Sequence, residues 1–267
     1  MNYFWASVLD FANTITSIVG TQLLKDFGQV QASQKADGSL VTQSDHWADM
    51  IIREAIASHF PSHGILSEEA EHKFPDTEWC WIIDPLDGTT NFTRGIPIWG
   101  ISLGLLYQGI PVFGYVHFPP IAQTFHGFWD GESGITGLEN GAFLNGRAIH
   151  SSTDSASSNH FFNLCSRSAS LLQQPLPCKI RMLGVASYNF LTIASGAALG
   201  GMEATPKIWD MAGAWAIVQA AGGVWVPLDS EAIFPLKIEQ DYGRKSFPTL
   251  VASSPELVRL FKPLIKI

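Results

Sequence analysis

Apolar side chains recur at helical spacing in the first part of the chain. Between residues 3 and 27 they recur about every three or four positions, and this period predicts a helix. Thr42 and Asp45 then match a capping box, in which each side chain satisfies a backbone N–H of the other residue. This motif predicts a second helix that ends near residue 59. The N-terminal part is therefore expected to place two helices ahead of any sheet.

The pattern changes to strands after the second helix. A short apolar run at 65–67 ends in Glu68 and Glu69, and longer apolar runs follow it. Gln108-Gly109 separates two of these runs in the manner of a hairpin turn, and later Asn-Gly pairs predict that the antiparallel meander continues. The longer runs begin at residue 79 and cover 99–107, 112–117 and 124–129, and the Asn-Gly pairs lie at 140–141 and 145–146.

Helices and strands alternate in the second half of the chain. Trp209 and Asp210 begin an Ala-rich segment that is predicted to be helical, and a Gly-Gly pair ends it. We expect an N-terminal α+β lobe at 1–150 and a C-terminal α/β lobe at 151–267, joined in one compact unit. Further strands are predicted at 160–165, 224–227 and 250–253, and further helices at 186–198 and 255–261.

The composition indicates a folded protein and argues against two kinds of partner. Of 267 residues, 46% are hydrophobic and 15% are charged, a balance that supplies a large core and excludes disorder. The net charge of −8 argues against nucleic acid and anionic membranes, because both require a basic surface. Two long stretches without charge, 95–129 and 182–202, are interrupted by prolines or by polar residues and glycines, and neither is expected to span a membrane.

Cysteine and histidine usage excludes several classes of site. The 3 cysteines lack CxxC spacing, which fits a reducing cytosol and argues against a disulfide framework or a cysteine–zinc site. No basic segment precedes the first apolar run, so we expect no signal peptide and a cytoplasmic protein. The 8 histidines show no HExxH spacing, and GxSxG and Walker A sequences do not occur, which argues against zinc hydrolase, serine hydrolase and P-loop chemistry.

One short acidic segment carries the strongest signal for chemistry. Asp84 and Asp87 follow an apolar run that breaks at a proline, and burying such carboxylates unpaired would be costly. Asp-Pro and Asp-Gly are common turn dipeptides, but two acids together at a strand end favour Mg²⁺, which prefers hard oxygen ligands. Gly88, Thr89 and Thr90 follow with backbone N–H groups and hydroxyls that suit a phosphate. The segment therefore predicts a metal beside a phosphate.

Other acidic residues are candidates to complete such a site. Mg²⁺ needs more oxygens than two aspartates supply, and Glu68 and Glu69 end a predicted strand, although adjacent acids also occur in solvated loops. Adjacent residues of an extended chain point to opposite sides, so only one of the two is expected to be a ligand. Asp210 is a further candidate, and its alternative role is the N-cap of the helix that follows it.

Two segments together resemble the signatures of the inositol monophosphatase family. They are the run WIIDPLDGTTNF at 81–92 and the run WDMAGA at 209–214, and the Glu-Glu strand end precedes both, as in the family. The resemblance extends over essentially the whole chain. It implies a layered α-β-α-β-α sandwich of the sugar phosphatase type, in the α+β or α/β class, with two or three Mg²⁺ ions, lithium sensitivity and a homodimer.

The resemblance also implies roles for individual residues. The metal ligands would be Glu68, Asp84, Asp87 and Asp210, together with the carbonyl oxygen of Leu86. The phosphate would be held by Gly88, Thr89 and Thr90, and Thr89 with Asp45 would orient the attacking water, so that the catalytic group comprises Asp45, Glu68 and Thr89. The substrate would further contact Asp87, Asp210, Glu203 and the leaving-group segment Gly184, Val185, Ala186 and Ser187.

Two positions depart from the family pattern. Ser67 stands before the glutamate pair where glycine is usual, and Ser39 stands before Leu-Val-Thr where an aspartate is often found. The second departure lies in the loop that carries Lys35. Neither is a proposed metal ligand.

The predicted function is hydrolysis of a phosphate monoester by a metal-activated water. Myo-inositol 1-phosphate is the expected substrate and L-histidinol phosphate the alternative. Fructose 1,6-bisphosphate and 3′-phosphoadenosine 5′-phosphate are less favoured, because the sequence offers no basic cluster for a second phosphate. A haloacid-dehalogenase-type phosphatase would have the spacing DxD, whereas Asp84 and Asp87 have two residues between them. The remaining alternative is a non-catalytic binding protein of the same fold.

Overall fold

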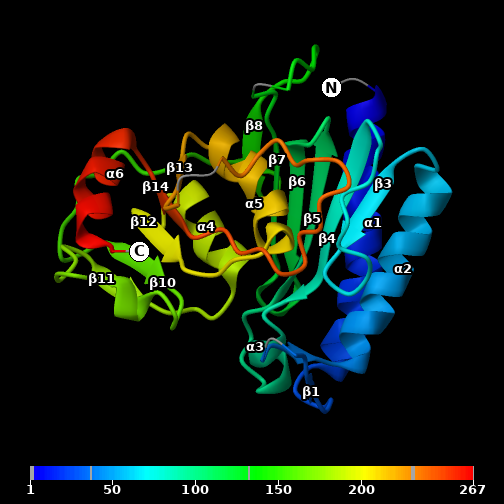
Figure 1. Cartoon of the computed structure of the whole chain (residues 1–267), viewed down its shortest axis with the longest axis horizontal. Coiled ribbons are helices and arrows are strands. Elements are labelled where there is room, and N and C mark those ends of the chain that lie inside the picture. The colour runs from blue at the N-terminus through cyan, green and yellow to red at the C-terminus, as the bar shows by residue number, and fades with distance from the viewer. Residues whose placement is uncertain (1–2, 37, 132, 230–231, 267) are drawn as a thin grey trace.

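The computed structural model describes residues 3–36, 38–131, 133–229 and 232–266. Within these residues, a seven-stranded sheet, a five-stranded sheet and the helices around them form five layers. Figure 1 shows them in the order α1 with α2, the larger sheet, α4 with α5, the smaller sheet, and α6. The predicted α-β-α-β-α arrangement is confirmed. The helices are α1 (Tyr3–Asp26), α2 (Gln43–His59), α3 (Thr89–Thr93), α4 (Ala186–Ala194), α5 (Ile208–Ala220) and α6 (Pro255–Phe261).

The larger sheet has the strand order β3-β4-β5-β6-β7-β8-β9, and only β3 and β4 in it are parallel. Helices α1 and α2 pack on one face of the sheet and α5 on the other. Its central strands are therefore buried on both faces and appear in the sequence as continuous apolar runs without alternation. These strands are β3 (Gly64–Ser67), β4 (Trp79–Asp87), β5 (Gly100–Tyr107), β6 (Ile110–Phe118), β7 (Gln123–Phe128), β8 (Gly141–Leu144) and β9 (Arg147–Ala148).

Tight turns join the antiparallel strands of this sheet. Gln108 and Gly109, both with positive φ (48° and 81°), form the predicted hairpin between β5 and β6. The second Asn-Gly pair likewise turns the chain between β8 and β9. The first pair does not form a turn: Gly141 begins β8, and the Asn140 side chain bonds to Asp130 instead. The predicted antiparallel meander is confirmed, with a turn at the second Asn-Gly pair only.

The smaller sheet has the order β11-β10-β12-β14-β13, with β10 parallel to both of its neighbours. Two of its strands, β11 and β12, were not predicted; β12 begins with Gly200-Gly201, which are poor strand formers. A Cβ at Gly200 would lie 2.9 Å from ring atoms of Phe162 and Phe261, so the strand depends on the absence of a side chain there. These strands are β10 (Phe161–Leu164), β11 (Lys179–Arg181), β12 (Gly200–Glu203), β13 (Val224–Pro227) and β14 (Thr249–Ala252).

Helix α4 ends at Ala194, earlier than the predicted residue 198, and Gly196 with a φ of +74° follows. The predicted lobe boundary near residue 150 falls between the last strand of the larger sheet and the first strand of the smaller one. Because α5 packs on the larger sheet although it follows that boundary, the division into two lobes stays a prediction. Within the described residues, no helix combines the length and apolar character that a membrane crossing requires.

Strand β4 does not end at Pro85, where the sequence indicated a break. It continues to Asp87, which pairs with Gly100 of β5, and its register shifts between Asp84 and Asp87. Such a bulge re-aims the side chains of the strand that contains it. The proline lies within the bulge, where the ladder needs no N–H from it. The acidic segment is thus the bulged end of a buried strand.

A glycine seam, formed by Gly104 of β5 and its pairing partner Gly114 of β6, lets helix α5 approach the larger sheet closely. A Cβ at Gly114 would lie 1.8 Å from the carbonyl oxygen of Gly213, and one at Gly104 would lie 2.8 Å from the backbone of Ala212. Both contacts involve the helix backbone, which cannot move aside as a side chain can. The seam therefore sets the height of the first turn of α5, which carries Asp210, above the sheet.

Candidate active site

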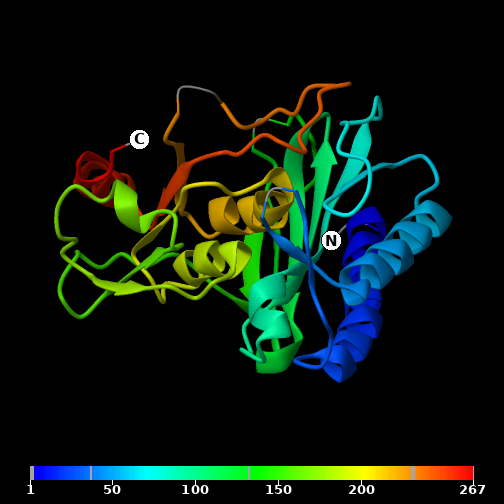
Figure 2. The ribbon, with the colours of Figure 1, turned by 60° about the horizontal axis from the view of Figure 1, so that its bottom comes forward.

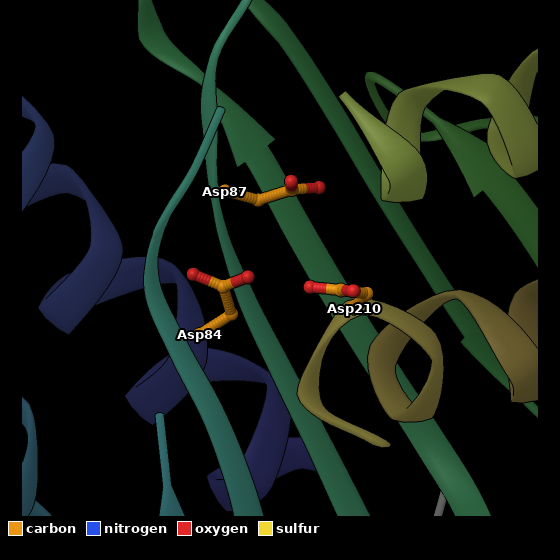
Figure 3. Close-up of side chains that lie close together, drawn as sticks. All are labelled: Asp84, Asp87 and Asp210. Carbon is orange, nitrogen blue, oxygen red and sulfur yellow. The ribbon is translucent and has the colours of Figure 1, made fainter. Parts of the chain in front are cut away.

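Three aspartates from two elements converge beside the end of β4. Asp84 and Asp87 come from the bulged end of that strand, and Asp210 comes from the first turn of α5. Each offers an oxygen atom, and these three atoms all lie within 4.8 Å of one another. Figure 3 shows the three side chains directed toward a common point. The prediction that these residues lie together is confirmed.

Each of the three carboxylates accepts at least one backbone hydrogen bond. Asp84 Oδ1 accepts from the N–H of Leu86 (3.0 Å), and Asp87 Oδ2 accepts from the N–H of Ser187 (2.9 Å). Asp210 Oδ2 accepts from the N–H of Lys207 (2.7 Å). Lys207, not Asp210, is the N-cap of α5, so the alternative assignment of Asp210 as N-cap is wrong.

Burial and mutual repulsion make this group of charges costly. Burial raises the pKa of Asp84, Asp87 and Asp210, and the nearby acidic charges raise that of Asp84 and Asp210 further. No lysine or arginine of the described chain forms an ion pair with any of the three. The group therefore lacks a counter-charge from the protein itself.

Lys35 binds both residues of the glutamate pair. Its Nζ donates to Glu68 Oε1 (2.9 Å) and to Glu69 Oε1 (2.5 Å). The expectation that the two side chains point to opposite sides is wrong, because the strand ends at Ser67 and the chain turns there. Glu68 also borders the aspartate cavity, and its charge raises the pKa of both Asp84 and Asp210. This contact of Lys35 with the glutamate pair was not predicted from the sequence.

Thr89 and Asp45 meet across a long stretch of sequence. Gly88, with a φ of +95°, turns the chain out of β4 into α3, and Thr89 is the first residue of that helix. Its hydroxyl donates to Asp45 Oδ1 (3.0 Å) and lies 3.1 Å from the carbonyl oxygen of Leu86. The other carboxylate oxygen of Asp45 accepts from the N–H and the hydroxyl of Thr42, which completes the predicted capping box. The capping box at the start of α2 thus orients the Asp45 carboxylate so that it accepts the hydrogen bond from the Thr89 hydroxyl.

A cavity of about 450 Å³ opens above these residues. The β1–β2 hairpin (Ser33–Gln34 and Leu40–Val41), which lies beside α3 in Figure 2, contributes part of its wall, including Ser39. Ser187 does not line the cavity: its side chain is buried, and its N–H holds Asp87. The predicted residues that do line it are Glu68, Asp84, Leu86, Asp87, Gly88, Thr89, Thr90, Gly184, Val185, Ala186, Glu203 and Asp210.

The far end of the cavity contains side chains that the sequence did not reveal. Cys165, Ser166 and Arg167 follow β10, and Thr205 follows β12. No motif spacing connects these positions, but the carboxyl ends of adjacent parallel strands, as β10 and β12 are, commonly form ligand sites. Their place in the cavity could be found only once the order of the smaller sheet was known.

Glu203 is the acidic residue at this far end. It closes β12, is almost fully buried, and its Oε1 accepts from Asn189 Nδ2 at 2.6 Å. Burial raises the pKa of Glu203 to about 7. Asn189 lies on α4 and in turn is bonded through its carbonyl oxygen to Asn163. The carboxylate is therefore fixed in orientation.

The serine that replaces the usual glycine before the glutamate pair has a local function. The Ser67 hydroxyl is buried and donates to Asp49 Oδ1 of α2 at 2.5 Å. Asp49 also binds Arg53 one turn further along the helix (2.8 Å). The substitution thus ties the end of β3 to α2, and it leaves the aspartate group unaffected.

Sequence comparison identifies the family. The model of the inositol monophosphatase family matches residues 5–256. The chain belongs to the inositol monophosphatase family. Members of this family are phosphoric monoester hydrolases, and the resemblance seen in the two signature segments is confirmed.

Different relatives are named for different phosphatase activities. An inositol-1-monophosphatase of Synechocystis is 34% identical over 236 residues, which cover 81% of this chain and 77% of that protein. A histidinol-phosphatase of Chlorobaculum parvum is 29% identical over 229 residues, covering 80% and 83%. The solved structure of an IMPase from Thermotoga maritima has a TM-score of 0.78 and 26% identity, and it covers 96% of this chain and 95% of its own.

The buried acidic side chains that line the cavity predict how the stability of the protein depends on pH. Burial raises the pKa of Glu68 and of Glu203 from 4.5 to about 7, so the folded protein keeps protons that the unfolded chain has released. Asp84, Asp87 and Asp210, whose pKa values burial also raises, act in the same direction, whereas His63 and His126, whose pKa values burial lowers to about 4, act in the opposite direction. Because the acids outnumber these histidines, the free energy of unfolding in EDTA is expected to fall as the pH rises from about 4.5 to about 7. Urea unfolding at about pH 5, 6, 7 and 8 measures it. A flat profile, or a rise over this range, would contradict the assignment.

Proposed function

We propose that this chain is a Mg²⁺-dependent phosphatase that hydrolyses myo-inositol 1-phosphate or a similar polyol monophosphate to the free alcohol and phosphate. The observation that carries the proposal is the group formed by Asp84, Asp87 and Asp210, whose oxygens lie within 4.8 Å of one another. Three buried carboxylates without a counter-charge from the described chain are stabilised when a cation joins them. The cavity above them is large enough for a sugar-sized ester.

The donor set fits Mg²⁺. It consists of oxygen atoms alone, and hard oxygen ligands are those that Mg²⁺ prefers over imidazole or thiolate. We propose that the three aspartates, with Glu68 and the carbonyl oxygen of Leu86, hold two or three ions. When bound, Mg²⁺ would neutralise the phosphate charge and lower the pKa of a coordinated water.

The residues of the chain itself would orient the reactants. The Asp45 carboxylate holds the Thr89 hydroxyl, and this pair would fix the direction of the attacking water. Gly88 turns the chain so that α3 begins at Thr89, where the first N–H groups have no acceptor within the helix and would bind phosphate oxygens. Glu203 would accept a hydrogen bond from a hydroxyl of the leaving alcohol. No side chain is required to form a covalent bond with phosphorus.

The water-orienting pair gives a specific prediction. Thr89→Val is expected to lower kcat by about 100-fold, a loss typical of removing one positioned proton-transfer group. The affinity for Mg²⁺ should fall much less than kcat, because among the proposed ligands the Thr89 hydroxyl contacts only the Leu86 carbonyl oxygen and bonds to none of the three aspartates. Thr89→Ser should restore most of the rate. Steady-state phosphate release measures both, and Thr93→Val, which removes a similar hydroxyl bonded only within α3, serves as the matched control. A Thr89→Val enzyme with wild-type kcat would contradict the role.

The relatives' names leave more than one substrate class open. The matching histidinol-phosphatase shows that a similar sequence serves an amino alcohol ester, so we retain L-histidinol phosphate as the alternative. We also propose a cytoplasmic homodimer that is sensitive to lithium, as the family resemblance implies. A non-catalytic role is disfavoured because the proposed ligands and the Thr89–Asp45 pair are all present.

A panel of esters tests the substrate. Purified protein with Mg²⁺ is offered inositol 1-phosphate, histidinol phosphate, fructose 1,6-bisphosphate and phosphoadenosine phosphate, and released phosphate is measured. We expect the highest kcat/KM with inositol 1-phosphate. A higher value with histidinol phosphate would replace the proposed substrate by the alternative, while the proposed chemistry would stand.

A further inference from the structure

The leaving-group end of the cavity contains one cation among many acids. Of the described residues that line the cavity, Arg167 alone has a positively charged side chain, whereas five are acidic. It lies beyond the carboxyl end of β10, as Glu203 and Thr205 lie at and beyond the carboxyl end of β12. The parallel register of these strands, which pairs Leu164 with Met202, places Arg167 beside Thr205 when it is continued.

The guanidinium of Arg167 is held in a defined position. Its Nη1 donates to the Thr205 hydroxyl at 2.9 Å, although the side chain is otherwise exposed to solvent. Its positive charge acts on Glu203, whose pKa it lowers against the larger opposing effect of burial. Glu203 itself is fixed by Asn189. An acceptor held by Asn189 and a donor bonded to Thr205 therefore line the same cavity, from the carboxyl ends of two adjacent parallel strands.

We propose that Arg167 and Glu203 together select a leaving alcohol with two neighbouring neutral hydroxyls, one donating to Glu203 and the other accepting from Arg167. This inference rests on the proposed phosphatase function and narrows its substrate class. A vicinal diol supplies one hydroxyl that can donate and a second, on the adjacent carbon, that can accept, and it adds no charge to the pair.

The charges of the pair disfavour the other substrate classes. An ammonium group, as in an amino alcohol phosphate, would be attracted by Glu203 but repelled by Arg167. A second phosphate would be attracted by Arg167 but repelled by Glu203 and by the aspartates beyond it. A neutral polyol avoids both repulsions. The pair therefore favours the polyol monophosphate over the amino alcohol ester that a relative's name suggests.

Two esters that differ only in hydroxyl groups test the proposal. Inositol 1-phosphate and cyclohexyl phosphate share the ring and the phosphate, so the ratio of their kcat/KM values reports what the hydroxyls contribute. Arg167→Met is expected to reduce this ratio by about tenfold, the loss that follows when a charge-assisted hydrogen bond is removed. The loss should appear in KM more than in kcat, because the contact is made by the bound substrate.

Two further variants separate a direct contact from a structural effect. Thr205→Val should reduce the ratio by a smaller factor, because Thr205 acts only by positioning Arg167, and adding it to Arg167→Met should cause no further loss. Arg147→Met, an exposed arginine on β9 away from the cavity, should leave the ratio unchanged. An additive loss in the double variant would show that Thr205 acts independently, which would overturn its positioning role.

The proposal fails in ways that differ from a failure of the phosphatase function. An unchanged ratio in Arg167→Met would overturn it even if the wild type hydrolyses both esters. A loss confined to fructose 1,6-bisphosphate would also overturn it, because Arg167 would then bind a second phosphate. If the wild type hydrolyses neither ester, the phosphatase function itself is wrong. The role of Arg167 is then tested by calorimetry of inositol 1-phosphate binding in the presence of Ca²⁺. Equal affinity in wild type and Arg167→Met would overturn the proposal.

Discussion

Replacing Asp210 with asparagine is expected to lower phosphate release by at least about 1,000-fold, because the proposed metal site, which would supply several kcal/mol of transition-state stabilisation, would lose a charged ligand. The fold should survive. The asparagine carbonyl can still accept the hydrogen bond from the Lys207 N–H, now made at 2.7 Å, so the first turn of α5 keeps its cap. Asp210 is also one of three mutually repelling buried acids, and removing its charge relieves that repulsion.

The same substitution should therefore raise the melting temperature of the metal-free protein. For a chain of this size each kcal/mol corresponds to roughly 2 to 4 °C. Added Mg²⁺ should stabilise the wild type and have much less effect on Asp210→Asn, since binding to the folded state is what produces such a shift. Asp76→Asn, an exposed aspartate outside the cavity, is the matched control for both measurements. Activity within tenfold of the wild type would show that Asp210 is not a metal ligand.

Replacing Gly114 with alanine is expected to destabilise the protein by about 3 kcal/mol, at the upper end of the usual cost of overpacking. The added Cβ would lie 1.8 Å from the carbonyl oxygen of Gly213, so β6 and α5 must separate. Separation moves the helix that carries Asp210 away from β4, and the affinity for Mg²⁺ should fall together with stability. Urea unfolding and a Mg²⁺ titration of phosphate release measure the two effects.

A second glycine separates the steric effect from the loss of backbone freedom. Gly146 has a φ of +75°, and a Cβ added there would have no neighbour within 4 Å, so alanine costs only left-handed strain, about 1 kcal/mol. Gly146→Ala should leave the affinity for Mg²⁺ unchanged because the turn between β8 and β9 does not line the cavity. If Gly114→Ala costs no more than Gly146→Ala, the glycine seam does not set the position of α5.

The acidic residues of the site could be predicted because their chemistry is local. Asp84 and Asp87 are expensive to bury near each other, and that cost is visible in the sequence without knowledge of the fold. The same holds for the capping box of Thr42 and Asp45, whose two halves are three residues apart and depend only on helix geometry. The contact from Asp45 to Thr89 followed from the family resemblance and from no spacing in the chain.

The residues that sequence reasoning missed depend on tertiary arrangement. Lys35 reaches Glu68 and Glu69 across more than thirty positions, from a hairpin of two-residue strands too short to leave a periodic pattern. Arg167 and Thr205 become neighbours only because β10 and β12 pair in parallel, and β12 begins with two glycines that hide it as a strand. Long-range pairing of this kind has no local signature.

The strand end predicted at Pro85 was wrong for a different reason, which is local backbone geometry. Proline removes a ladder hydrogen bond and is normally excluded from a central strand, so the sequence favoured a strand end there. The structure instead places it in a bulge, where β4 and β5 lose their register between Asp84 and Asp87. The bulge is what directs Asp84 and Asp87 toward Asp210, so the local rule was broken at the site itself.

The central claim is that buried carboxylates of this chain bind Mg²⁺ for phosphate ester hydrolysis. The most direct test is phosphate release from inositol 1-phosphate by EDTA-treated protein, measured before and after Mg²⁺ is restored. We predict no release above background in EDTA and full recovery on addition of Mg²⁺. Phosphate release that persists in EDTA would contradict this prediction. So would a protein that Mg²⁺ stabilises against heat but that hydrolyses neither this ester nor cyclohexyl phosphate.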